Sequence, residues 1–407
     1  MTGIEPIPDE QVDGDEFDVV VVGGGPAGST AAYTAATLGL RTCLVDRQIF
    51  PREKLCGGLV TPRTRTLFEE IHRTTLPETL FFSSDLVTFF SDAKWLAQPD
   101  PYCTLYFTMR KEFDAHLLGL AEQAGAMVRV GHGVESIDRS DKRVTLSNGS
   151  SVRYRVLIGA DGVHSIVAKT LFGSSFNNDT IGFGLEVEVP RERLPNQSNA
   201  VEIDFGAARW GYGWVFPKHK TFTIGVGGIH RLNPDLKARF EAYLEIKHLA
   251  LSEFKVKGQY IPFGDYRRVP GSADILLCGD AAGVVDPITG EGIAYALQTG
   301  HHAAQAAATA IRGNVTERAL ETYLPHYRLA AKAIDQANWW RYLIFPQLLR
   351  KPFGWAFADA STLQKGYLDI LRGSHGYNAL YWLFAKQAAK AVRKLGRRLI
   401  GKKDPNS

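Results

Sequence analysis

Cysteine is scarce in this sequence, and its pattern points neither to a disulfide scaffold nor to a metal site. The four cysteines are Cys43, Cys56, Cys103 and Cys278, and no two of them form a CxxC pair. The eleven histidines contain no HxxxH pair, and the adjacent His301 and His302 would point in different directions on a helix. We therefore expect no metal, no disulfide framework and a reducing compartment, the cytoplasm.

The sequence also lacks an export signal and a segment that would cross a membrane. No basic stretch followed by an apolar one stands near Met1, so we expect no secretory signal. The longest uncharged run spans 19–40, but it contains four glycines before residue 30 and a proline. A buried strand, a turn and a helix explain this run better than a membrane span does.

Charge is distributed unevenly between the two ends of the chain. The formal net charge is +4, yet residues 1–18 contain seven acids and no base, whereas residues 386–407 contain eight bases and one acid. Apolar residues recur every three or four positions towards the C-terminus, at Ala385, Ala388, Val392, Leu395 and Leu399, and four of the seven tryptophans precede them, at Trp339, Trp340, Trp355 and Trp382. A basic amphipathic helix of this kind is typical of peripheral contact with an anionic membrane. The alternative is a helix that packs on the body and exposes its basic face; nucleic acid is not expected, because no binding motif accompanies the charge.

A glycine-rich turn follows the first buried strand. The valine run 19–22 is typical of a strand covered on both faces of a parallel sheet, and it leads directly into a GxGxxG sequence. Gly23 permits the tight turn, Gly25 lets the backbone approach a pyrophosphate, and Gly28 lets the helix pack against the strand. A second strand ends at Asp46, 18 residues after Gly28, where a carboxylate accepts a ribose hydroxyl. Together these features predict a dinucleotide site at a helix N-terminus.

Another buried strand ends in Gly279 and Asp280, and the segment 286–292, DPITGEG, and an alanine-rich helix follow it. This arrangement resembles the second fingerprint of FAD-dependent oxidoreductases. The resemblance implies that Asp280 binds the ribityl chain of FAD and that the helix starting near Gly290 directs its positive end at the flavin. A helix N-terminus would stabilise the negative charge of a reduced flavin. The alternative is that Asp280 only caps a helix.

A third motif lies between the first two. Residues 159–165, GADGVHS, are similar to the GADGxxS segment of flavin hydroxylases, and Arg110 stands where that family has a basic residue near the FAD phosphates or ribityl chain. Asp161 could instead serve only the turn, and Arg110 could be a solvated charge at a helix start. The resemblance also implies flavin contacts at Pro26, Ala27, Arg47, Gly57, Gly58, Val134, Pro287, Gly292 and Ile293.

Two shorter motifs narrow the choice of reaction among flavin enzymes. A CGG segment occupies 56–58, and the sequence YGWVFP at 212–217 precedes the GxG at 225–227 by seven residues. Together they resemble the geranylgeranyl reductase family, whose signature is YxWxFP-(x7)-GxG with an earlier CGG. The resemblance implies an FAD-dependent enzyme that reduces carbon–carbon double bonds of an isoprenoid chain with hydride from the reduced flavin. It places Cys56 near the flavin ring, and Cys56 and Tyr212 are the candidates for delivering the proton.

The aromatic residues of this signature alternate, so Tyr212, Trp214 and Phe216 share one face of a strand. An aromatic wall suits a long apolar chain, and we predict that Trp214 and Phe216 bind substrate. Plain sheet core is the alternative for the three aromatics. An ordinary small buried residue is the alternative for Cys56.

The order of the motifs predicts an α/β protein with an FAD-binding Rossmann-like domain of the aromatic hydroxylase type and an inserted antiparallel-sheet domain. We expect an acidic tail at 1–16, a discontinuous FAD-binding domain at 17–175 and 264–312, a catalytic domain at 176–263 and a helical region at 313–407. No second complete GxGxxG occurs, so electrons are expected from transient NAD(P)H or from a redox protein. A flavin monooxygenase and a non-catalytic prenyl-binding protein are the competing functions.

Overall fold

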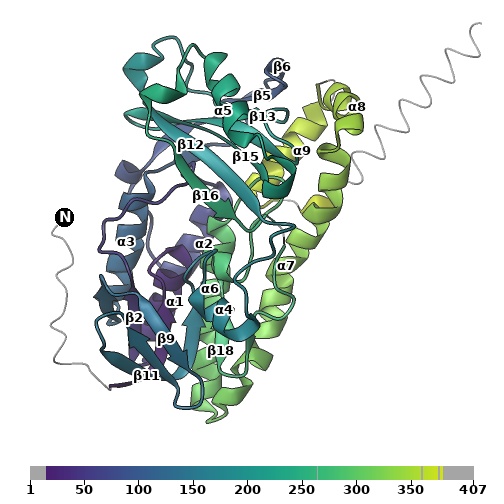
Figure 1. Cartoon of the computed structure of the whole chain (residues 1–407). Coiled ribbons are helices and arrows are strands. Elements are labelled where there is room, and N and C mark those ends of the chain that lie inside the picture. Colours follow the sequence, from purple (N-terminus) through teal and green to yellow (C-terminus); the bar gives the residue numbers. More distant parts are fainter. Residues whose placement is uncertain (1–14, 264, 359–360, 375, 379–407) are drawn as a thin grey trace, which may run out of the picture.

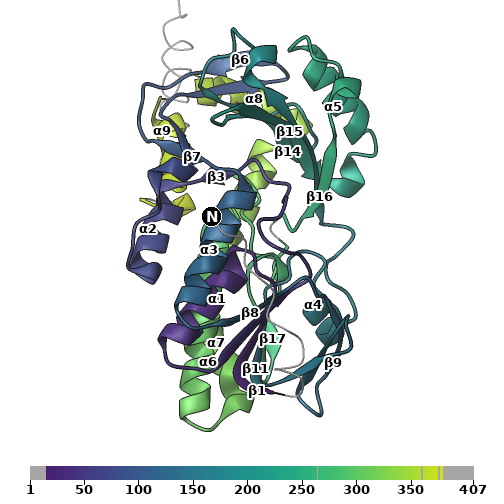
Figure 2. The ribbon, with the colours of Figure 1, turned by 90° about the vertical axis from the view of Figure 1, so that its left-hand side faces the viewer.

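The computed structural model describes residues 15–263, 265–358, 361–374 and 376–378 (Figure 1). The basic segment 386–407 and the acidic residues before 15 lie outside the described residues, so the expectations for both ends stay predictions. Figures 1 and 2 show one large sheet at each end of the molecule and long helices that run between them.

The larger sheet has the strand order β17-β18-β11-β1-β2-β8, and β10 and β9 extend it beside β11. Its strands are β1 (Glu16–Val22), β2 (Thr42–Asp46), β8 (Met127–Val130), β9 (Val134–Asp138), β10 (Arg143–Leu146), β11 (Ser151–Gly159), β17 (Gly271–Ser272) and β18 (Ile275–Leu277). All pairings from β8 through β2, β1 and β11 to β18 are parallel. Parallel strands end at the same edge, so the three predicted flavin motifs meet there.

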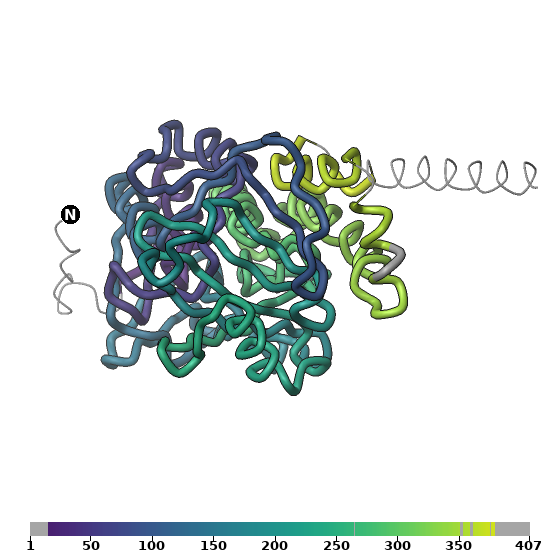
Figure 3. The backbone as a smooth tube through the Cα atoms, turned by 90° about the horizontal axis from the view of Figure 1, so that it is seen from above, coloured from purple at the N-terminus to yellow at the C-terminus, as the bar shows by residue number. Residues whose placement is uncertain are grey.

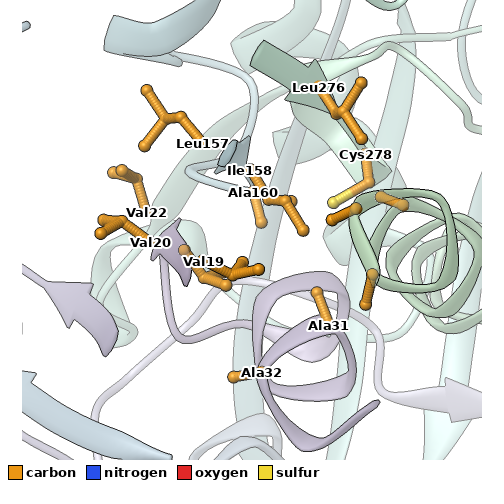
Figure 4. Close-up of a cluster of buried hydrophobic side chains, with 14 of the residues drawn as sticks. Val19, Val20, Val22, Ala31, Ala32, Leu157, Ile158, Ala160, Leu276 and Cys278 are labelled. Carbon is orange, nitrogen blue, oxygen red and sulfur yellow. The ribbon is translucent and has the colours of Figure 1, made fainter. Parts of the chain in front are cut away.

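Small and branched residues build the core of this sheet. Val19, Val20 and Val21 have no exposed surface, and Figure 4 shows Ala31 and Ala32 of α1 beside the valines of β1. The helices that pack here are α1 (Pro26–Thr37), α3 (Arg110–Gln123), α4 (Ile166–Phe172) and α6 (Ile293–Arg312). Figure 2 shows α1, α3 and α6 together on one side of the sheet. Burial on both faces explains why these strands read as continuous apolar runs.

The second sheet has the order β16-β12-β15-β14-β13-β5-β6. Its strands are β5 (Val87–Ser91), β6 (Lys94–Ala97), β12 (Gly182–Pro190), β13 (Val201–Asp204), β14 (Gly211–Pro217), β15 (Thr221–Ile229) and β16 (Lys257–Ile261). This corrects the expectation of an antiparallel sheet built from 176–263 alone. The segment 87–97, which we had assigned to the FAD-binding domain, supplies two strands, and β5 pairs with β13 in parallel. Such a pairing joins residues more than a hundred positions apart, and local sequence patterns do not show it.

Shorter elements connect the two sheets. A small sheet with the order β3-β7-β4 contains β3 (Leu59–Val60), β4 (Phe82–Ser84) and β7 (Leu105–Phe107), and α2 (Pro62–His72) follows β3. The helix α5 (Leu236–Glu245) covers the outer face of the second sheet, and 3-10 turns occur at Glu78–Leu80, Arg191–Arg193, His230–Leu232, Leu251–Glu253, Gly279–Ala281 and Thr316–Arg318. The CGG segment comes directly before β3, which holds it between the large sheets.

The C-terminal part is helical as far as it is described, in agreement with the prediction. It contains α7 (Ala319–Ile344), α8 (Gln347–Ala358) and α9 (Ser361–Arg372), which Figure 3 shows in yellow-green along one side of the molecule. Trp340, Phe345 and Phe357 are buried against the second sheet, so part of the aromatic cluster is core. No helix within the described ranges is long and apolar enough to cross a membrane.

Candidate active site

A cavity of about 760 Å³ is lined by residues from both large sheets and from the segment that joins them. The larger sheet contributes the turns that follow its parallel strands, and the second sheet contributes the aromatic strand β14. The predicted site residues that line the cavity are Gly23, Gly25, Pro26, Ala27, Asp46, Arg47, Cys56, Gly57, Gly58, Arg110, Val134, Asp161, Tyr212, Trp214, Phe216, Asp280, Gly290, Gly292 and Ile293. The fold therefore brings together motifs that lie up to 270 positions apart.

Three predicted flavin contacts do not line the cavity: Gly28, Gly279 and Pro287. A side chain at Gly28 would collide with the carbonyl oxygen of Gly23, and a Cβ at Gly279 would stand 2.8 Å from that of Ala27. Both glycines therefore let chain segments approach one another closely. A direct flavin contact of Gly28, Gly279 or Pro287 stays a prediction.

The glycine-rich turn is built as an anion site. Gly23 has φ of 105°, a conformation that favours glycine, and the N–H of Gly24 donates to the Asp46 carboxylate at 2.6 Å. The helix α1 begins at Pro26 without a side-chain cap, so its first N–H groups are free to bind an anion. A Cβ at Gly25 would meet only Arg52, at 3.6 Å, which leaves this backbone open towards the cavity.

Arg52, which the sequence analysis missed, is the cation at this turn. Its Nη2 lies 3.2 Å from the Asp114 carboxylate, and its Nη1 is buried with no hydrogen-bond partner among the described residues. Arg110 donates to the same carboxylate twice, from Nε at 2.7 Å and from Nη2 at 2.9 Å. Arg110 is therefore a buried, oriented cation and not a solvated charge. The spacing of Arg110 and Asp114, four residues apart on α3, could have revealed this pair.

Asp161 makes the contacts of a helix cap. Its carboxylate accepts from the Ser165 hydroxyl at 2.5 Å and from the N–H of Ile166 at 2.7 Å. Burial raises the pKa of Asp161 even though these bonds favour the anion. The structure thus shows the turn-forming role for this residue, and a direct flavin contact of its side chain stays a prediction.

The loop between β18 and α6 is held from two sides. The Tyr377 hydroxyl lies 2.8 Å from both oxygens of Asp286, whose Oδ1 also accepts from the N–H groups of Ile288 and Thr289. Glu291 is engaged by the Thr61 hydroxyl and by Arg63. Asp280 lines the cavity, and α6 starts at Ile293 without a side-chain cap. The N-terminus of α6 is therefore free to face a ligand, as the motif predicts.

Each aromatic residue of β14 lies over a glycine of another motif. The Trp214 ring occupies the place where a Cβ of Gly225 would stand, and it also lies against Gly227. A Cβ at Gly57 would come within 2.6 Å of the Phe216 ring. These contacts explain why the YxWxFP, GxG and CGG segments occur together. Each glycine leaves the space in which a large aromatic ring packs. The Nε1 of Trp214 is buried without a partner among the described residues.

Tyr212 also packs against a glycine, and this contact fixes the position of its hydroxyl. A Cβ at Gly290 would stand 2.5 Å from its hydroxyl, which donates to the carbonyl oxygen of Thr289 at 2.6 Å. Burial raises the pKa of this phenol well above its usual value. The single proton of Tyr212 is engaged in holding the loop that precedes α6. The geometry thus favours positioning of that loop over the predicted proton delivery.

Cys56 lies in a polar corner of the cavity. Its N–H donates to Oε1 of Glu186 at 3.0 Å, and its Sγ accepts from the N–H of Gly58 at 3.4 Å. Glu186 lies on β12, is 2% exposed and lines the cavity. Burial raises the pKa of its carboxyl from 4.5 to about 7. The sequence analysis missed Glu186, since a glutamate on an alternating strand reads as a solvated residue.

Comparison with known proteins agrees with this site. The chain matches the family described as FAD binding domain over residues 16–195 and 251–338. It is 32% identical to a menaquinone reductase of Mycobacterium tuberculosis, covering 72% of this chain and 76% of that protein. It is 30% identical to a geranylgeranyl diphosphate reductase of Rhodobacter capsulatus, covering 72% and 75%. This chain belongs to the geranylgeranyl reductase family of FAD-dependent oxidoreductases. The family prediction and the cofactor FAD are thereby confirmed.

Solved structures confirm the predicted fold class of this reductase-family chain. A geranylgeranyl bacteriochlorophyll reductase-like protein from Thermoplasma acidophilum superposes with a TM-score of 0.72 at 23% identity, covering 94% of this chain and 99% of that one. A flavin-dependent brominase superposes with a TM-score of 0.66 at 19% identity, covering 93% and 100%. The fold is therefore shared by flavin enzymes of different chemistry, and it does not fix the reaction.

The residues of this family member fit FAD. The buried Nη1 of Arg52, which has no partner among the described residues, and the open backbone at Gly25 suit a pyrophosphate, and Asp46 suits a ribose hydroxyl. Asp280 and the uncapped start of α6 line the same cavity. These are the residues that would hold the cofactor. The family match is discontinuous, and its gap, 196–250, falls in the second sheet.

Proposed function

We propose that this protein reduces carbon–carbon double bonds of an isoprenoid chain attached to a lipid or to a diphosphate. The observation that carries the proposal is the aromatic strand β14, whose Trp214 and Phe216 line the same cavity as the flavin motifs. A prenyl chain is long and apolar, and a wall of buried rings with few polar groups is what such a chain binds best. The named activities of the relatives, on geranylgeranyl diphosphate and on menaquinone, support the same substrate class.

Bound FAD in its reduced form would supply the hydride for this reaction. The chain's own residues would bind the cofactor and orient the substrate. Arg52 and Arg110, both held by Asp114, would neutralise the cofactor phosphates, and Tyr212 holds the loop before α6. The rings of Trp214 and Phe216 would exclude water from the alkene and hold the prenyl chain in the cavity.

The electron donor is transient in this proposal. The part of the chain that the structure describes contains one parallel sheet with a glycine-rich dinucleotide turn, and the FAD motifs occupy it. NAD(P)H would therefore have to reach the flavin without a domain of its own, or a reduced redox protein would dock instead. Anaerobic mixing with NADH, with NADPH and with a reduced ferredoxin distinguishes these donors by the rate at which flavin absorbance disappears.

We further propose that the protein contacts an anionic membrane through its C-terminal helices. Six of the twelve large apolar side chains that are exposed in the described residues fall between 339 and 355: Trp339, Tyr342, Leu343, Leu348, Leu349 and Trp355. Trp95 of β6 is 66% exposed, and β6 lies against α8, where Arg350 pairs with Asp92 at 2.8 Å. Amphipathic aromatic residues of this kind are enriched where a protein meets the headgroup layer. The basic segment 386–407 would add attraction to anionic lipid.

Product analysis tests the proposed function. Dithionite-reduced protein would be incubated without oxygen with geranylgeranyl diphosphate, with a digeranylgeranyl glycerophospholipid and with a menaquinone. We expect mass spectrometry to show that at least one of these substrates gains whole pairs of hydrogens. The substrate that gains them identifies the class of prenyl compound that the protein reduces. Oxygen incorporation after air is admitted, with no anaerobic gain, would replace the reductase with a monooxygenase. A purified protein without flavin would instead support the prenyl-binding alternative.

A further inference from the structure

Reduction of an isolated alkene needs a proton as well as a hydride, and of the two residues predicted from the sequence to give it, Tyr212 has its proton engaged. The Tyr212 hydroxyl donates its proton to the carbonyl oxygen of Thr289. The Cys56 sulfur accepts from the N–H of Gly58, a contact that does not use the thiol proton, so Cys56 stays the competing candidate. The source of the proton is therefore open, and the inference below rests on the proposed function.

Glu186 is the acid that the geometry presents. Its side chain points from β12 into the cavity, and its Oε1 is fixed by the N–H of Cys56 at 3.0 Å. Its Oε2 is buried and has no hydrogen-bond partner among the described residues. An unpartnered buried carboxyl oxygen is costly, and such groups are kept where a ligand or a reaction uses them.

Glu186 forms no ion pair with a residue that the structure describes. The charged groups that act on its carboxyl are Lys218, Glu188 and Lys257, and Cys56 adds only its backbone N–H. Lys218 donates to Glu188 at 3.0 Å, and Lys257 donates to Glu53 at 3.0 Å, so both nearby ammonium groups are already neutralised. The two ammonium groups lower the pKa of the Glu186 carboxyl, but burial outweighs them and raises it to about 7, so a large fraction of the carboxyl is protonated near neutral pH.

We infer that Glu186 protonates the alkene. In this step the π bond of the alkene breaks, and one carbon receives the proton from Oε2 of Glu186. The other carbon receives the hydride, with its electron pair, so two C–H bonds form, the alkene is reduced by two electrons and the reduced flavin is oxidised. The Glu186 carboxylate is reprotonated from solvent before the next turnover. The Cys56 N–H, which bonds to Oε1, holds the carboxyl plane and stabilises the anion after transfer.

Glu291, another buried acid that lines the cavity, already has a partner for each oxygen. Glu291 accepts from the Thr61 hydroxyl through Oε1, and its Oε2 lies 3.4 Å from the Arg63 guanidinium. Burial raises the pKa of Glu291 as well, and Arg63 beside it lowers it, but both of its oxygens already have partners. Its contacts join the α6 loop to the start of α2, which is a structural task. Glu186 therefore differs from Glu291 in having a free oxygen towards the cavity.

The test compares Glu186→Gln with Glu202→Gln. Glu202 is a buried carboxylate of the same sheet that bonds to Lys247 and Gln197 and does not line the cavity. Single turnovers of the reduced holoenzyme with geranylgeranyl diphosphate would be followed without oxygen at pH 7. We expect Glu186→Gln to bind FAD and accept electrons like the wild type but to reduce the alkene at least about 100-fold more slowly, within the range for general acids. Glu202→Gln should stay within about threefold of the wild type.

Two further variants keep the test decisive if Glu186→Gln folds poorly. Glu186→Asp retains an acid and should keep more activity than Glu186→Gln, whereas Glu186→Ala should regain activity when formic acid is added. Infrared difference spectra between pH 6 and pH 8 should show a protonated carboxyl band that Glu186→Gln lacks, and this readout needs no turnover. If the wild type reduces the alkene and the rate of Glu186→Gln is within threefold of the wild-type rate, the inference about Glu186 is wrong while the proposed function stands. If the wild type reduces no prenyl substrate, the proposed function fails, and this inference fails with it.

Discussion

Asp114 orients two guanidinium groups at the cavity, because Arg110 donates to it twice and Arg52 lies 3.2 Å away. We predict that Asp114→Asn weakens FAD binding at least tenfold and lowers the free energy of unfolding by about 3–5 kcal/mol, the usual cost of breaking a buried ion pair from one side. Fluorescence titration of apoprotein with FAD and urea unfolding would measure both quantities.

The control for this prediction is Asp235→Asn, which alters an exposed pair with Arg239. Such pairs contribute about 0–1 kcal/mol, so flavin affinity and stability should hardly change. Equal flavin affinity in wild type and Asp114→Asn would show that the two arginines do not depend on this carboxylate.

Glu186 also makes a prediction about stability and pH. The pKa of its carboxyl is about 7 in the folded protein, against an ordinary value of 4.5. Below pH 4.5 the group is protonated in both states. Between pH 4.5 and 7 the unfolded chain loses the proton while the folded protein keeps it, so rising pH favours unfolding; above 7 the effect is complete.

Urea unfolding at pH 5 and pH 8 would measure this contribution. The wild type should lose about 2–3 kcal/mol more than Glu186→Gln over that interval, from the size of the pKa difference. An identical pH dependence in the two proteins would show that burial does not hold the proton on Glu186.

At the scale of elements, the signature of the second sheet depends on ring-on-glycine contacts between neighbouring strands. We predict that Gly225→Ala, which places a methyl group where the Trp214 ring lies, destabilises the protein by about 1–3 kcal/mol through overpacking. It should also slow substrate reduction, because the aromatic wall shifts. Thermal unfolding and single-turnover rates would measure the two effects.

Gly119→Ala is the matched control for this substitution. Gly119 lies on α3 with no atom near the position of an added Cβ, so alanine should be neutral or stabilising there. A Gly225→Ala protein as stable as the wild type would mean that the Trp214 ring can move aside freely.

The sequence predicts elements of this protein better than it predicts the contacts between them. The β-branched runs, the glycine-rich turns and the positions of three flavin motifs were readable because each depends on local backbone chemistry. The parallel pairing of β5 with β13 was not, since it joins Val87 to Val201 across the chain. Arg52 and Glu186 were missed for the same reason: their partners, Asp114 and Cys56, lie on other elements. Tyr212 was readable as a site residue, but its bond to Thr289 was not.

At the scale of the whole molecule, the exposed apolar side chains at 339–355 make a prediction about lipid binding. We expect the full chain to sediment with vesicles that contain anionic lipid and to bind vesicles of zwitterionic lipid less. Replacing Leu348 and Trp355 together by serine should reduce vesicle binding at least tenfold, because these side chains are 91% and 73% exposed and would enter the headgroup layer.

The control replaces Ile49 and Phe172, exposed apolar residues outside this patch, by serine, and it should leave vesicle binding unchanged. Unchanged binding of the Leu348 and Trp355 double variant would contradict the proposed surface. Loss of binding only when 386–407 are removed would assign the contact to the basic segment alone.

The central claim is that the flavin held here gives its electrons to an alkene and not to oxygen. It is tested most directly by mixing the reduced holoenzyme with geranylgeranyl diphosphate in a stopped-flow instrument without oxygen. The account predicts that the oxidised flavin spectrum returns in a substrate-dependent phase, with one carbon–carbon double bond saturated for each flavin oxidised. A flavin that stays reduced with every prenyl substrate until air is admitted would contradict the account.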